Sequence, residues 1–139
     1  MEKRALSGFL VRLVACVIYG VLVGYLAITA AQAPPGVSDN SSYQNFGITT
    51  GAIVGLSFFI VGHIIHLLLK KQIKWERADF LLHVVIGVAI GFTSSFIVHL
   101  SADSYGLIDA NMTTIIIGSV IPAIFGGALP AVVLSLVKV

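Results

Sequence analysis

Charged residues are scarce in this sequence. Of its 139 residues, 10% are Asp, Glu, Lys or Arg and 58% are hydrophobic, and the mean hydropathy is +1.03. A soluble domain carries roughly 25% charged residues, so the composition excludes an ordinary water-facing surface. The formal net charge of +2 is small. There is also no basic patch with interleaved aromatic residues, so we expect no nucleic-acid partner.

The sequence also has little that could carry catalysis. It contains one cysteine, Cys16, which excludes an internal disulfide and any metal site built on two cysteines. We expect this thiol to act as a small buried hydrophobe. No nucleophile–base–acid set, phosphate-binding loop or pair of catalytic carboxylates is present, and the polar connections are too short for a soluble catalytic domain. We therefore expect a protein that is not an enzyme.

Long apolar runs dominate the rest of the chain. Residues 13–31, 46–69, 80–100 and 112–137 hold no Asp, Glu, Lys or Arg. Each run meets the roughly 20 residues that a helix needs to cross a bilayer core. Backbone polar groups must be paired in lipid, which makes such runs helical. The sequence predicts an all-α integral membrane protein, a single domain over residues 1–139 with helices at about 8–31, 46–69, 79–100 and 112–137.

Lys and Arg are absent from two of the three connections between these runs. The eight basic residues are Lys3, Arg4, Arg12, Lys70, Lys71, Lys74, Arg77 and Lys138. The positive-inside rule therefore predicts cytoplasmic termini and a cytoplasmic turn at residues 70–79. We expect a multi-pass protein of the bacterial plasma membrane. Arg12 lies just before the first run and about one turn inside the first predicted helix, and we expect its side chain to snorkel back to the headgroups.

Glycines recur at a spacing of four residues in three of the runs. The pairs are Gly20/Gly24, Gly51/Gly55 and Gly87/Gly91. Glycines four apart share one helix face and let another backbone approach closely, and helix association in lipid depends on that contact. The pairs predict tight packing, either within the chain or with other transmembrane helices. The stretches 19–25 and 86–92 resemble each other, which suggests two tandem helical hairpins related by duplication.

Three of the four histidines flank the basic turn. His63 and His66 are three residues apart and share one helix face, and His83 would lie at a similar depth on the next helix. They fit a hydrogen-bonding role between helices. His66 and His83, with His63, could instead hold a haem b or a chlorophyll. Further alternatives are a metal such as zinc bound by the three histidines, and proton transfer.

The last run contains helix-breaking residues. Pro122, Gly126, Gly127 and Pro130 predict a kinked or interrupted helix, because proline removes a backbone donor and clashes with the preceding turn. Such breaks line substrate sites in some transporters. In other helices, neighbouring groups simply satisfy the freed carbonyls.

The leading interpretation is a non-catalytic accessory or scaffold subunit. It would contact the lipid bilayer and pack with other transmembrane helices, in a homo-oligomer or a larger membrane complex, and hold no cofactor. One alternative is an electron- or energy-transfer subunit that binds haem or chlorophyll through His66 and His83. Another is a small transporter or pore built around the final helix.

Overall fold

The chain folds into four helices. The structure, a computed structural model, describes the backbone of residues 2–30, 41–69, 75–104 and 111–137, and the side chains of residues 6–29, 44–69, 80–101 and 111–125. The helices are α1 (Glu2–Ala30), α2 (Ser41–Leu69), α3 (Trp75–Ser104) and α4 (Met112–Val137). The predicted all-α, four-helix fold is confirmed.

The first three helices are longer than their apolar runs. α2 begins at Ser41 rather than near residue 46, and α3 extends from Trp75 to Ser104 rather than from 79 to 100. An apolar run marks only the part of a helix that contacts hydrocarbon, whereas helical hydrogen bonding continues into the polar flanks. α4 has the predicted bounds.

Three of the helices are long and apolar enough to cross a bilayer. Their apolar segments are Leu6–Thr29, Gln44–Leu69 and Phe80–Ser101, and a shorter apolar segment, Met112–Phe125, lies in α4. Large aliphatic and aromatic side chains cover the outside of all four helices. This outward apolar surface requires lipid contact, and the chain is a multi-pass membrane protein.

The helices meet along narrow stripes that are rich in small residues. On α4 the buried positions are Ile115, Ser119 and Ala123, each four residues after the last. Most buried positions among the described side chains of the other helices follow the same three-or-four spacing. These positions are Gly8, Gly20, Val23, Gly24, Ala27 and Ile28 on α1, Gly47, Gly51, Val54, Gly55, Phe59 and Gly62 on α2, and Gly87, Ile90, Gly91, Ser94, Ser95 and Val98 on α3. Small side chains thus lie inside and large ones outside, as expected for helices that pack in lipid.

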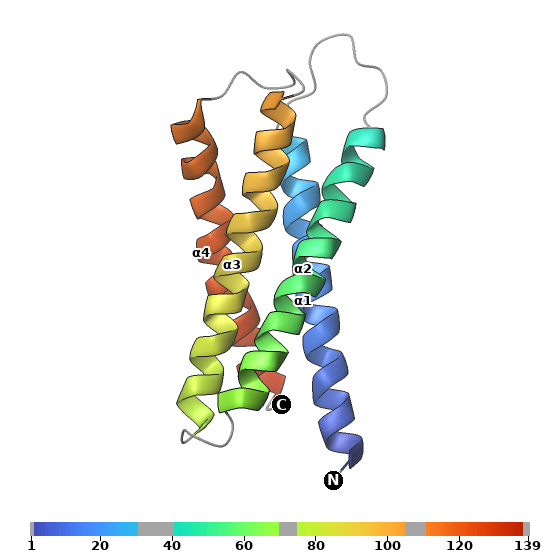
Figure 1. The fold of residues 1–139 in the computed structure, drawn as a ribbon, viewed down its shortest axis with the longest axis vertical. Coiled ribbons are helices and arrows are strands. Elements are labelled where there is room, and N and C mark those ends of the chain that lie inside the picture. Colours follow the sequence, from blue (N-terminus) through green and yellow to red (C-terminus); the bar gives the residue numbers. More distant parts are fainter. Residues whose placement is uncertain (1, 31–40, 70–74, 105–110, 138–139) are drawn as a thin grey trace.

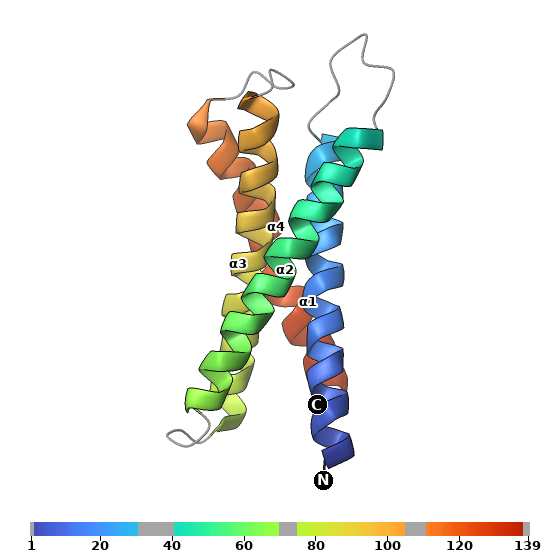
Figure 2. The ribbon, with the colours of Figure 1, turned by 45° about the vertical axis from the view of Figure 1, so that its right-hand side comes forward.

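Two antiparallel hairpins make up the bundle (Figure 1). α1 packs along α2 and α3 along α4, while α3 also contacts both α1 and α2. α1 and α4 touch only slightly. The two hairpins cross and then diverge towards the end that holds the C-terminus of α1 (Figure 2). The N-terminus of α1 and the C-terminal part of α4 lie at the opposite end (Figure 1).

Backbone-to-backbone contact joins α1 to α2. A Cβ atom on Gly51 would collide with the carbonyl of Gly20, and one on Gly24 would collide with the carbonyl of Gly47. Gly55 lies in the same way against the carbonyl of Cys16. Each step of four residues along α1 therefore matches a step of four back along α2, which fixes the register of the hairpin.

The second hairpin uses its glycine differently. Gly91 on α3 lies against the carbonyl of Pro122 on α4, whereas its counterpart in the first hairpin, Gly24, faces Gly47. The glycine contacts of the two hairpins therefore fall at different positions, and the duplication remains a prediction.

α4 is capped by Asn111, whose side-chain oxygen accepts a hydrogen bond of 2.9 Å from the backbone N–H of Thr114, the usual N-cap arrangement.

We expect Gly51→Ala to destabilise the protein. The added methyl group meets backbone rather than a mobile side chain, so α1 and α2 must separate, and overpacking of this kind costs about 1–3 kcal/mol. Gly118→Ala is the matched control because a Cβ there has no neighbour within 4 Å. This control should be neutral or stabilising by up to about 1 kcal/mol through helix propensity. The free energy of unfolding in bicelles measures both, and equal effects would contradict the register.

Candidate functional site

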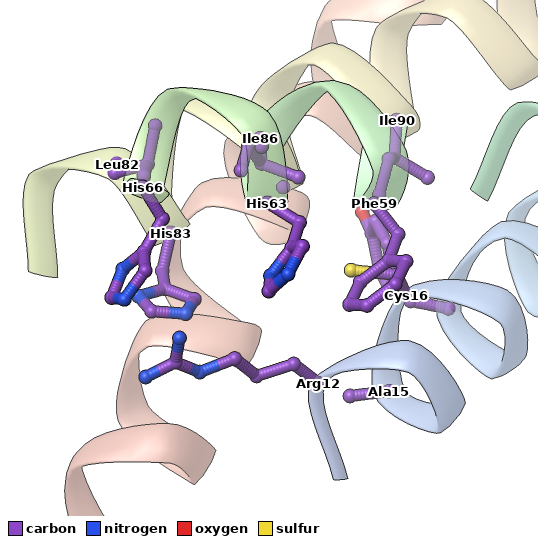
Figure 3. A pocket seen from close by; sticks show the side chains of 13 residues that line it. Arg12, Ala15, Cys16, Phe59, His63, His66, Leu82, His83, Ile86 and Ile90 are labelled. Atoms are coloured by element: carbon purple, nitrogen blue, oxygen red, sulfur yellow. The ribbon is translucent and has the colours of Figure 1, made fainter. Parts of the chain in front are cut away.

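A polar cavity lies where the two hairpins meet, towards the end that holds the N-terminus. α1 contributes Arg12, α2 contributes His63 and His66, and α3 contributes His83 (Figure 3). We call this space, of about 40 Å³, the histidine cavity. Its remaining walls are mostly apolar and are formed by Ala15, Cys16, Tyr19, Phe59, Gly62, Leu82, Ile86, Gly87 and Ile90. The three histidines of the candidate site are thus brought together.

Ring stacking orders the α2 side of the histidine cavity. The rings of His63 and His66 are nearly parallel, at 7°, with centroids 6.4 Å apart. Phe59 extends the stack on the other side of His63, with a centroid distance of 5.9 Å. Phe9 of α1 meets His63 edge to face, with a centroid distance of 5.0 Å. His63 is therefore held from two helices, and its place follows from the α1–α2 register.

Arg12 is the part of this cavity that the sequence did not reveal. Its guanidinium points towards His66 and His83 and lies beneath their rings (Figure 3). The predicted return of this side chain to the headgroups stays a prediction, and in the structure the side chain lines the cavity. Arg12 is also the single Lys, Arg, Asp or Glu among the described side chains. The presence of a lone arginine inside an apolar run is the signal that could have identified it.

A haem or chlorophyll does not fit between His66 and His83 in this arrangement. Pockets that hold drug-sized ligands enclose roughly 300–1,000 Å³, whereas the histidine cavity encloses about 40 Å³. The Arg12 guanidinium also approaches the two histidine rings from below (Figure 3). A macrocycle would have to separate the hairpins before either imidazole could ligate it.

The three histidines also do not form a metal-ligand set. Among the described residues, no group of three or more His, Cys, Asp or Glu side chains is placed to hold a metal ion. His63 and His66 stack face to face, whereas ligands of one ion aim their ring nitrogens at a common point.

A second and much larger space opens between the hairpins, nearer the other end of the bundle. We call it the α1–α4 groove. It measures about 600 Å³ and is open on one side. Its walls come from three helices and are mainly apolar, and they are Tyr19, Leu22, Val23, Leu26 and Ala27 of α1, Ser95 and His99 of α3, and Gly118, Ile121, Pro122 and Phe125 of α4.

Few polar groups face the groove, and each is oriented by hydrogen bonding. The Tyr19 hydroxyl donates to the Pro122 carbonyl at 2.7 Å, which links α1 to α4. His99 Nδ1 lies 2.8 Å from the Ser95 carbonyl and 3.1 Å from its hydroxyl. His99 is therefore tied to its own helix and lines the groove. The buried Ser94 hydroxyl has no hydrogen-bond partner among the described residues.

α4 continues through both of its prolines. It is a single helix from Met112 to Val137, with Pro122 and Pro130 inside it. Pro122 lines the groove and accepts the Tyr19 hydrogen bond. The helix is not interrupted at Gly126, Gly127 or Pro130, and a kink at these residues stays a prediction.

Comparison of this chain with protein-family models, curated proteins and solved structures finds no match. Its function must therefore be argued from the two spaces described above.

Tyr19→Phe should weaken the contact between α1 and α4. The substitution removes the hydroxyl that reaches the Pro122 carbonyl, and interhelical hydrogen bonds in membranes contribute about 0.6 kcal/mol on average and up to about 1.7 kcal/mol. Tyr25→Phe on the same helix is the control, since Tyr25 is exposed. The free energy of unfolding in bicelles should fall by that amount for Tyr19→Phe only, and a larger loss from Tyr25→Phe would contradict this assignment.

Proposed function

We propose that this protein is a non-catalytic accessory subunit that receives a transmembrane helix of another subunit in the α1–α4 groove. In this proposal all four helices span the bacterial plasma membrane, with both termini on the cytoplasmic side. α4 supports a fourth span because its 26 residues include no charged side chain. The basic residues at both termini and at residues 70–79 support the orientation.

The observation that carries the proposal is the shape of the groove. The hairpins diverge at one end of the bundle (Figure 2), and the groove there is walled by α1, α3 and α4. Most of the described part of α4 faces outward, and on the groove side Ile121 is 58% and Phe125 59% exposed. α4 is therefore held to this chain along one stripe only, and its other faces are available to another helix.

The chemistry of the groove suits a helix better than acyl chains alone. At Gly118 an added Cβ would meet nothing within 4 Å, so a partner backbone can approach there as closely as helices in lipid prefer. His99 and Ser95 place polar groups on the same wall. Polar side chains of this kind hydrogen-bond across helices, whereas acyl chains give them no partner.

The glycine pairs do not form the binding site for the helix of another subunit. Gly20, Gly24, Gly51 and Gly55 are used between α1 and α2, and Gly91 lies against α4. Close glycine contacts therefore hold the chain together, and association with another subunit falls to the groove. This separates internal stability from partner binding, so the two can be altered independently.

The orientation can be measured by cysteine labelling. In a Cys16→Ala background, Ser41→Cys should react with a membrane-impermeant maleimide on intact cells, because residues 32–45 are predicted to be external. Lys74→Cys should react only after the membrane is permeabilised. The reverse pattern would overturn the orientation while leaving the fold intact.

Filling the groove should abolish association. Gly118→Phe places a large side chain in open space, so we expect a folded chain whose affinity for its partner helix falls by about tenfold or more, equivalent to about 1.4 kcal/mol. Ile117→Phe is the control, because Ile117 is exposed but does not line the groove. Native mass spectrometry of protein extracted in mild detergent would compare the assemblies.

Three outcomes are informative. A stoichiometric complex that Gly118→Phe disrupts and Ile117→Phe preserves supports the proposal, with a second copy or a different subunit distinguished by mass. A chain that is always a monomer contradicts it. A monomer that carries lipid, lost only in Gly118→Phe, would assign the groove to lipid and also contradict it.

A further inference from the structure

We propose that the histidine cavity binds the phosphate group of an anionic phospholipid. The proposal concerns a different site from the α1–α4 groove and does not depend on partner binding. It rests on the donors that converge on the cavity, on the size of the cavity, and on its depth.

The donors suit a phosphate oxyanion. Arg12 presents a planar fork of five N–H donors, which binds phosphate oxygens in pairs and stays charged at all physiological pH values. His66 and His83 place their rings next to each other, with the guanidinium beneath both (Figure 3), and each imidazole can donate through a ring nitrogen. Hydrogen bonds of this kind, with ionised partners, are shorter and stronger than neutral ones.

The size of the cavity matches a headgroup phosphate rather than a whole lipid. A single water needs about 10–15 Å³ of cavity measured with a water-sized probe. The histidine cavity, at about 40 Å³, therefore admits a group of a few heavy atoms. The glycerol and acyl chains would remain outside, where α2 and α3 present exposed apolar side chains such as Leu67, Leu68 and Leu81.

The depth of the cavity is that of the lipid headgroup boundary. His66 lies three residues before the end of the apolar segment of α2, and His83 lies three residues after the start of that of α3, so both are about 5 Å inside at 1.5 Å per residue. Arg12 lies six residues inside its segment, about 9 Å by the same rise, and its side chain extends towards the histidines (Figure 3). Basic pockets between helices on the cytoplasmic side are known binding places for anionic headgroups.

Phosphate binding in the cavity would also explain why Arg12 lies within a membrane helix. A charged residue within a membrane helix is costly to insert, which marks such a residue as functional by default. The α1–α2 register places Arg12 beside the face of α2 that carries His63 and His66. An arginine that only contacted the membrane surface would not need this position.

The test uses the full chain in nanodiscs made of phosphatidylcholine with a minority of phosphatidylglycerol. Native mass spectrometry would count the lipids that stay bound to the protein after it is released from the nanodiscs. We expect wild-type protein to retain phosphatidylglycerol in preference to phosphatidylcholine, and Arg12→Gln to lose that preference by about tenfold or more, as expected for removing hydrogen bonds between charged groups. Arg12→Lys should keep part of it, because a point charge remains without the paired donors.

Control variants distinguish lipid binding in the cavity from general charge attraction and from misfolding. Arg4→Gln removes the same charge from the N-terminal segment and should keep the preference. His83→Gln should lower it while Arg12 stays in place, and circular dichroism would confirm that each variant is helical. If Arg4→Gln and Arg12→Gln behave alike, or if wild-type protein shows no preference and binds no inorganic phosphate, the proposal is wrong.

A last measurement distinguishes the source of the phosphate. Delipidated protein would be titrated with inorganic phosphate in mild detergent and followed by calorimetry. Arg12-dependent binding of inorganic phosphate together with a lipid preference supports the lipid site. Arg12-dependent binding without any lipid preference would overturn the lipid assignment and make the ligand a soluble phosphate from the cytoplasm.

Discussion

The contact of the α1 backbone with the α2 backbone is the constraint on which the rest of the structure depends. Gly51 lies against the carbonyl of Gly20, and Gly55 against that of Cys16, so the helices can pair in one register only. Arg12 is one turn before Cys16, so the same register brings its backbone level with Phe59, and its side chain extends from there towards His66 and His83 (Figure 3). The histidine cavity is therefore a consequence of glycine packing some distance away, and no local feature of the histidines would produce it alone.

The hairpins meet each other through a different kind of contact. A Cβ on Gly62 of α2 would collide with the side-chain end of Ile86 on α3, so a side chain, rather than backbone, lies against this glycine. Side-chain contacts hold helices farther apart than glycine contacts do. The bundle is consequently tight within each hairpin and looser between them, and both the histidine cavity and the α1–α4 groove lie at the looser junction.

Much of the fold could be predicted from composition, because a helix that crosses lipid needs only length and apolarity. The shared face of His63 and His66 followed from their spacing, and the proximity of His83 followed from the short connection. The direction of Arg12, the hydrogen bond from Tyr19 to Pro122 and the groove could not be predicted. These three features depend on which helix each glycine face packs against. The glycine pairs at 20/24, 51/55 and 87/91 look alike in sequence, so the sequence does not reveal which helices they join. Tyr19 could have been suspected, since a phenol in the middle of an apolar run needs a hydrogen-bond partner.

Tyr19 gives the two spaces a common wall. It lines the histidine cavity on one side and the α1–α4 groove on the other, and its hydroxyl is bonded to the Pro122 carbonyl. α1 and α4 otherwise touch only slightly, so this bond is a principal link between them. Among the described residues, Tyr19 is the one that lines both spaces. Its position therefore depends at once on the packing of α1 and on the Pro122 carbonyl of α4.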